Sequence, residues 1–180
     1  MRSLFIYLYP LLLMLTTDPM TIDFGKDKND SWYSVNDGVM GGLSKGKTSY
    51  TANSLKFEGS VSFENNGGFA SVRSDYEVMD LSSYETVTIR YKSKGQSLAL
   101  NFNYYQRWWY PNYKANLPAT DGEWETLTLS LAELKEYRVG RPTGNMIAPQ
   151  QLERIIRLGI MTADKKEGAF EAEVDFIKFE

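Results

Sequence analysis

Apolar side chains recur at every second residue in much of the sequence after residue 55, and this periodicity constrains the fold more than any other feature. In LALNFNY (98–104), for example, the apolar residues Leu98, Leu100 and Phe102 alternate with smaller or polar ones. Such alternation is typical of antiparallel strands with one face in a core and the other in water. The stretches that show it are 55–63, 87–91, 98–104, 124–131, 156–160 and 170–176.

Turn-forming residues separate these stretches, whereas helical periodicity is scarce. Glycine occurs with Asn, Asp or Lys at 65–68, 94–95, 121–122 and 163–168. Only 130–137 and 149–156 have a helical pattern, and each is long enough for about two turns. The sequence therefore predicts an all-β fold, a two-sheet antiparallel sandwich of the jelly-roll kind.

The chain of 180 residues has room for one domain with a sizeable core, which we place at residues 20–180. Residues 1–19 are set apart by an uncharged apolar run, 4–15, that follows a single arginine. This run is shorter than the ~20 apolar residues that span a bilayer and resembles a secretory signal, which favours export, for instance to the periplasm. In the alternative, translation starts at Met20 and the domain is cytoplasmic. Only the N-terminal segment, if retained, would contact a membrane.

The composition excludes several classes of site. The sequence contains no cysteine and no histidine, which rules out thiolate chemistry, histidine-ligated zinc and serine hydrolysis with a histidine base. We therefore expect a protein that is not an enzyme and that needs no cofactor. The net charge of −3, with scattered lysines and arginines, argues against nucleic acid as a partner.

One short motif suggests a nucleotide. GGLSKGKT (41–48) has the spacing of a phosphate-binding P-loop, which requires a buried strand before it and a helix after it. The preceding DSWYSVNDGVM is polar and rich in turn formers, and the following SYTANSLKFEG alternates like a strand. We therefore expect no nucleotide, with Lys47 exposed on a loop or strand.

The same glycines fit another pattern. WYSVNDGVMGGLS (32–44), NNGGFASVR (65–73) and LGIMTADKKEGAFEAEVDFI (158–177) resemble the complex I intermediate-associated protein 30 family, from about Ile22 to Glu180. The resemblance implies a galactose-binding-like jelly roll, similar to several carbohydrate-binding modules. The mitochondrial members help to assemble respiratory complex I and are not enzymes. It therefore implies a protein-binding assembly factor or a chaperone-like module.

The glycine-rich motif predicts a tight loop. We expect Asn36-Asp37-Gly38 to form a turn in which Gly38 has a positive φ, and Trp32 to lie in the core. Two interpretations stay open, that the loop closes one end of the sandwich or that it contacts a partner. The residues of this motif loop are Trp32, Asn36, Asp37, Gly38, Gly41, Gly42, Ser44, Asn66, Gly67 and Gly68.

The stretch NYYQRWWYPNY (103–113) is rich in aromatic side chains. If the strand before it stays regular as far as Trp109, Tyr104 and Trp108 point into the core. The outward candidates for binding are then Tyr105, Arg107, Trp109 and the adjacent Tyr110. Such a patch could serve as packing, as a protein interface or as a platform for sugar rings.

Two carboxylates could serve a metal. Asp23 and Asp175 fall in the first and last predicted strands, which often neighbour each other, and they are weak candidates for structural Ca²⁺. The sequence as a whole predicts a non-catalytic binding or assembly module. Its partner is a protein, such as a respiratory complex subunit, or, as the alternative, a glycan bound by a carbohydrate-binding module.

Overall fold

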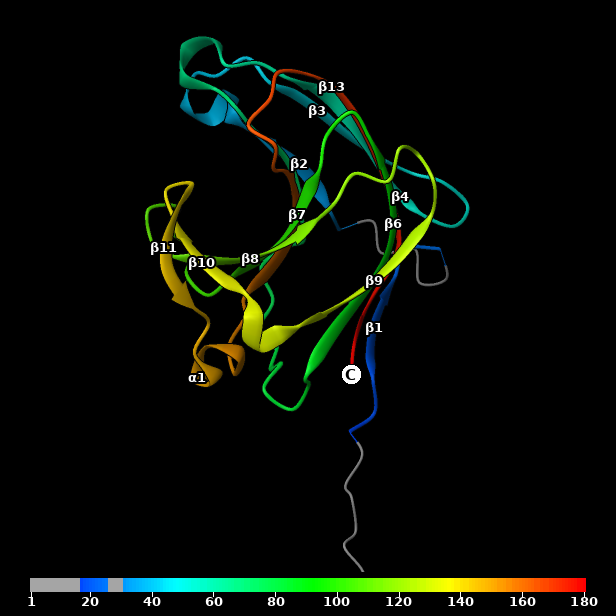
Figure 1. Ribbon diagram of the computed structural model, residues 1–180, viewed down its shortest axis with the longest axis vertical. Coiled ribbons are helices and arrows are strands. Elements are labelled where there is room, and N and C mark those ends of the chain that lie inside the picture. The colour runs from blue at the N-terminus through cyan, green and yellow to red at the C-terminus, as the bar shows by residue number, and fades with distance from the viewer. Residues whose placement is uncertain (1–16, 26–30) are drawn as a thin grey trace, which may run out of the picture.

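The computed structural model describes residues 17–25 and 31–180, which form two antiparallel sheets packed face to face (Figure 1). The predicted all-β sandwich is confirmed. The apolar run at 4–15, on which the expected signal rests, lies outside the described part of the chain, as does the rest of the 1–19 segment except residues 17–19. Within the described residues, no helix has the length and apolar character needed to cross a membrane.

The first sheet contains six strands, and its central strand pairs with three others. In spatial order they are β3 (Lys45–Tyr50), β4 (Leu55–Val61), β13 (Gly168–Phe179), β6 (Thr86–Lys94) and β9 (Glu125–Ser130), with β1 (Met20–Asp23) also paired to β13.

The second sheet contains seven strands. In spatial order they are β11 (Arg141–Met146), β10 (Lys135–Arg138), β8 (Asn112–Leu117), β7 (Leu98–Asn103), β12 (Arg157–Thr162), β5 (Ala70–Arg73) and β2 (Tyr33–Asn36). Short helical turns connect the strands: η1 (Asp37–Met40), η2 (Glu64–Asn66), η3 (Leu131–Glu133) and α1 (Pro149–Leu152).

Alternation along the strands fills the space between the two sheets. Leu98, Leu100 and Phe102 of β7 are fully buried, as the sequence pattern predicts. Phe102 packs edge-on against Phe179 of β13 with ring centroids 6.4 Å apart, which joins the two sheets. Burial of each such side chain stabilises the fold by about 1.5–3 kcal/mol. Trp32 also lies in the core, as expected, with 3% of its surface exposed.

The aromatic stretch does not continue strand β7. Asn103 pairs with Asn112, so residues 104–111 form the connection between β7 and β8. The expectation of a regular strand as far as Trp109 is therefore wrong, and so is the inward position of Trp108, of which 59% is exposed. Tyr104 is partly buried against the core.

The P-loop-like sequence lies on a turn and an edge strand. Gly41 ends η1, and the residues from Lys45 onward form β3, which is paired with β4. Lys47 is exposed on β3, as expected, opposite Glu58. Because a strand follows these glycines, there is no helix N-terminus in position to receive phosphate groups.

Candidate binding site

Asp37, in the motif loop, is completely buried and ties two segments together. Its carboxylate accepts hydrogen bonds from the backbone N–H and hydroxyl of Ser44 and from the N–H groups of Gly68 (2.6 Å) and Phe69 (3.1 Å). Burial alone would raise the pKa of Asp37, but the hydrogen bonds from Ser44, Gly68 and Phe69 lower this pKa below its usual value. The motif therefore holds the η1 turn against the segment before β5.

The glycines of the motif surround this carboxylate. A Cβ at Gly42 would collide with the Asp37 side chain, and one at Gly67 would lie 2.7 Å from Asp37 Oδ2. Gly41 has φ 90°, a left-handed conformation that glycine adopts without strain. Gly38 lies within η1, and its φ is not positive, so the prediction for Gly38 is wrong. The turn takes its left-handed residue after η1 rather than inside it.

Two asparagines of the motif also have local backbone roles. Asn36 donates a hydrogen bond from Nδ2 to the carbonyl oxygen of Gly46, at 3.1 Å, which joins β2 to β3. Asn66 adopts a positive φ of 60° in η2. These contacts favour the interpretation that the motif loop closes one end of the sandwich.

The outer face of the seven-stranded sheet carries a line of polar residues. Lys114 of β8 lies opposite Asn101 of β7, and Asn101 lies opposite Gly159 of β12. On the other side of β12, Gly159 lies opposite Arg73 of β5. Directly opposed residues share a face of the sheet, so this line crosses four adjacent strands. The surface is hollowed at the middle of this line because Gly159 has no side chain.

A groove with a volume of about 480 Å³ lies over this line. Its rim is formed by Val39 and Met40 of η1, by Val139 at the tip of the β10–β11 hairpin and by Trp108. Figure 1 shows the hairpin tip pointing toward η1. A second hollow, also of about 480 Å³, shares Lys114 and the hairpin tip with the first and extends it along the sheet.

The floor of the groove contains amide groups with unused acceptors. Asn101 is 7% exposed and donates from Nδ2 to Oδ1 of Asn103 at 2.9 Å. Its own Oδ1 and the Oδ1 of Asn112 are buried and accept no hydrogen bond from the described residues. Buried polar atoms are nearly always paired, so two free acceptors in one groove suit a ligand that donates hydrogen bonds.

Two cationic side chains, those of Arg73 and Lys114, lie beside these amides. Arg73 donates from Nε to Ser71 Oγ at 3.0 Å, and the stem of Arg73 leans over the centre of the line, since a Cβ at Gly159 would lie 3.2 Å from its Cγ. Burial lowers the pKa of Lys114 to about 8, and the nearby charges of Arg73 and Lys165 add to this effect. A residue in a cleft whose pKa is shifted by burial and by neighbouring charges is a candidate for a functional site.

The binding residues expected from the sequence lie in the 104–111 connection, as Trp108 does, but they do not line the groove. Tyr105, Arg107, Trp109 and Tyr110 are all exposed. Arg107 stacks over the ring of Trp109 at 5.3 Å, and the rings of Tyr105 and Tyr110 lie 4.8 Å apart.

Sequence reasoning placed Trp108 in the core and did not identify the residues of the groove floor. Of these residues only Asn101 lies in a predicted strand, 98–104, where it alternates with the apolar set; Arg73, Asn112 and Lys114 lie outside every predicted strand and carried no such signal.

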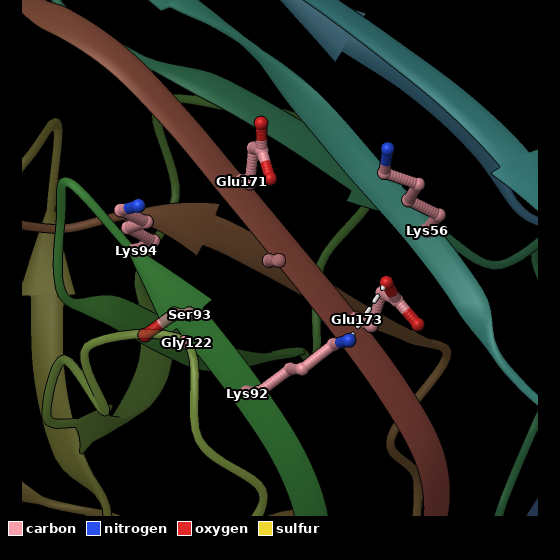
Figure 2. A pocket seen from close by; sticks show the side chains of 8 residues that line it. Lys56, Lys92, Ser93, Lys94, Gly122, Glu171 and Glu173 are labelled. Carbon is pink, nitrogen blue, oxygen red and sulfur yellow. Dashed lines mark ion pairs between the residues drawn. The ribbon is translucent and has the colours of Figure 1, made fainter.

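The outer face of the six-stranded sheet has a different character. Figure 2 shows a small hollow there, with lysines of β4 and β6 beside glutamates of β13. Lys92 pairs with Glu173 at 3.1 Å, and Lys56 pairs with Glu58 at 2.7 Å. The opposite charges on this face therefore largely satisfy one another.

The two calcium candidates lie on neighbouring strands, as expected, because β1 pairs with β13. Asp175 forms an ion pair with Arg90, and Asp23 Oδ1 accepts a hydrogen bond from the N–H of Gly25. In residues 17–25 and 31–180 there is no group of three or more acidic side chains that could hold a metal ion. Calcium at this position would have to compete with the Arg90 ion pair.

Solved structures with a similar fold include carbohydrate-binding modules. The family 11 carbohydrate-binding module of the cellulosomal cellulase Lic26A-Cel5E of Clostridium thermocellum matches with a TM-score of 0.66 and 15% identity, over 91% of this chain and 95% of that one. The family 11 module in complex with a β-1,3-1,4-mixed-linked tetrasaccharide matches with a TM-score of 0.62 and 17% identity, over 89% and 94%. The agarase AgWH50C matches with a TM-score of 0.57 and 8% identity, over 89% of this chain and 24% of that one. At these identities the similarity establishes the fold alone.

A search of curated proteins finds no match. A family model described as Complex I intermediate-associated protein 30 (CIA30) matches residues 22–174, which include the motif loop and most of both sheets. The resemblance seen in the sequence is thereby confirmed. The chain belongs to the Complex I intermediate-associated protein 30 family.

Proposed function

We propose that this protein is a non-catalytic binding module that holds a glycan chain in the groove of its seven-stranded sheet. The observation that carries the proposal is the pair of free acceptor oxygens on Asn101 and Asn112 in the groove floor. A sugar hydroxyl can donate to such an oxygen and can also accept from the Arg73 or Lys114 donors beside it. The flat ring of Trp108 at the rim offers an apolar surface for the face of a sugar ring.

The size of the groove also suits an oligosaccharide. Typical ligand pockets measure about 300–1,000 Å³, and the two adjoining hollows together fall near the upper end of that range. The similarity to carbohydrate-binding modules supports the proposal by analogy of fold only.

A second candidate function is assembly of a protein complex, supported by family membership and by the apolar rim. Val39 is 75% exposed, Met40 52% and Val139 54%, which is unusual for side chains of this kind. In this alternative the groove and its rim would bind a protein partner, such as a respiratory complex subunit, in an assembly or chaperone-like role.

Binding measurements on one set of variants separate the two candidates. Asn101→Ala and Trp108→Ala alter the groove, and Lys47→Ala on β3 serves as an exposed control. A glycan array and isothermal titration calorimetry should show a glycan that binds the wild type and the control but not the groove variants. If no glycan binds and a protein captured by the wild type is lost with Val39→Ser and Met40→Ser, the assembly role is correct and the glycan proposal is wrong.

A further inference from the structure

Positive charge is concentrated in the groove of an otherwise acidic protein. The two adjoining hollows are lined by Arg73, Lys114 and Lys165, and none of their described lining residues is an aspartate or glutamate. The chain has 23 acidic residues and a net charge of −3, so this segregation runs against the overall balance. A cleft lined by one sign of charge concentrates ions of the opposite sign.

These cations are not neutralised by the protein. Each ion pair found within the described residues lies on the six-stranded sheet, and none includes Arg73, Lys114 or Lys165. Arg73 uses only its Nε, toward Ser71, which leaves its two terminal nitrogens without a hydrogen-bond partner among the described residues. The ammonium of Lys114 lies 4.9 Å from the centre of the Tyr137 ring.

The arrangement brings the cations close enough to repel one another. Arg73 and Lys165 both disfavour the charged form of Lys114. Holding like charges together in a half-buried site costs free energy, which an anion in the groove would offset. The free terminal nitrogens of Arg73 can form two parallel hydrogen bonds to a carboxylate or a sulfate.

We infer that the groove selects an acidic glycan, with the carboxylate or sulfate of one sugar unit between Arg73 and Lys114 and its hydroxyls on Asn101 and Asn112. This inference rests on the proposed function and adds the class of sugar. The mixture of cations and amide acceptors also favours a sugar over an acidic peptide. A sugar ring carries several hydroxyls that can each donate to an amide oxygen and accept from a cation, whereas a peptide has one backbone N–H donor per residue.

Titration calorimetry with four probes of similar length tests the inference. The probes are a mixed-linkage glucan tetrasaccharide, a tetragalacturonate, a heparin-derived tetrasaccharide and a tetraglutamate peptide. We expect the wild type to bind an acidic tetrasaccharide, and the two acidic sugars distinguish carboxylate from sulfate. Affinity should fall about tenfold in Arg73→Gln and in Lys114→Met, and it should fall as salt is raised from about 50 to about 300 mM. Lys47→Ala should bind like the wild type, and thermal unfolding confirms that each variant is folded.

The opposing outcomes are distinct. If the neutral glucan binds as tightly as the acidic sugars and the charge variants are unaffected, the inference is overturned while the proposed function stands. If only the peptide binds, the ligand is a protein and both are overturned. If no probe binds at millimolar concentration, the proposed function fails and the inference fails with it.

Discussion

At the scale of single residues, Asp37 shows how the family motif acts. A buried carboxylate is costly unless its oxygens are paired, and here hydrogen bonds from three residues pair them. Ser44 donates hydrogen bonds to this carboxylate, and the glycines that flank the carboxylate leave space for it. The motif therefore encodes the closure of one end of the sandwich.

Replacing Asp37 tests this role. In Asp37→Asn, one acceptor oxygen becomes a donor that faces backbone N–H groups, so we expect a loss of about 2–4 kcal/mol in the free energy of unfolding. Urea denaturation measures it, with Glu64→Gln on the exposed η2 turn as the control. The pKa of Asp37 lies below 3.8 in the folded state, so its stabilisation is complete above that pH and is lost as the pH falls through the folded value. Wild type and variant should therefore converge in stability at acid pH, and equal losses in Asp37→Asn and Glu64→Gln at neutral pH would contradict this role.

A second prediction compares two glycines of the motif. Gly42→Ala places a Cβ against the Asp37 carboxylate and should destabilise the fold by about 1–3 kcal/mol. Gly38→Ala meets nothing within 4 Å in η1 and should change stability by less than about 0.5 kcal/mol. Thermal unfolding of both variants under the same conditions is sufficient. If Gly38→Ala destabilises the fold more than Gly42→Ala does, packing around Asp37 is not the reason for glycine at position 42.

Lys114 provides a third prediction, because its pKa is lowered to about 8 from an ordinary 10.5. Between these two values the unfolded chain binds more protons than the folded one, so stability rises as the pH increases through this interval. Lys114→Met should remove the cost of the buried charge and stabilise the protein by about 1 kcal/mol at pH 7, after allowance for solvent screening. Guanidinium denaturation at pH 7 and 10 measures both effects. If Lys114→Met is less stable than the wild type at pH 7, the environment of the Lys114 cation is not unfavourable.

At the scale of elements, the 104–111 connection determines which tryptophan lines the groove. Trp108 lines the groove, whereas Trp109 packs under Arg107 outside it. Both are exposed, at 59% and 43%, so replacing either should cost little stability. The two residues thus form a natural pair of test and control.

We expect Trp108→Ala to weaken glycan binding about tenfold, because stacking on an aromatic face is lost, and to leave unfolding within about 1 kcal/mol of wild type. Trp109→Ala should bind normally. Calorimetric titration of both variants with the glycan that binds the wild type decides between them. Lost binding in Trp109→Ala alone would move the site to the outer side of the loop.

The elements also show how far the sequence could predict the structure. Leu98, Leu100 and Phe102 alternate cleanly, so strand β7 and its buried face were predictable. The end of β7 at Asn103 was not, because aromatic residues suit a strand as well as a loop, and the pairing of Asn103 with Asn112 decides the outcome. Likewise, Arg73 and Lys114 are distant in sequence and meet only through the strand order β8-β7-β12-β5.

At the scale of the whole molecule, the two outer faces of the sandwich differ in how their polar and charged groups are paired. The six-stranded sheet carries lysines and glutamates in mutual contact (Figure 2). The seven-stranded sheet carries cations and amide oxygens that its own described residues leave unpaired. We therefore propose that the ligand binds on this second face.

The most direct test of binding on this face is the change in backbone amide chemical shifts of the ¹⁵N-labelled protein during titration with tetragalacturonate. We expect the largest changes at Arg73, Asn101, Lys114 and Gly159 and in the 104–111 connection, with little change on β3, β4 and β9. Shifts that are confined to the six-stranded sheet would contradict the proposal.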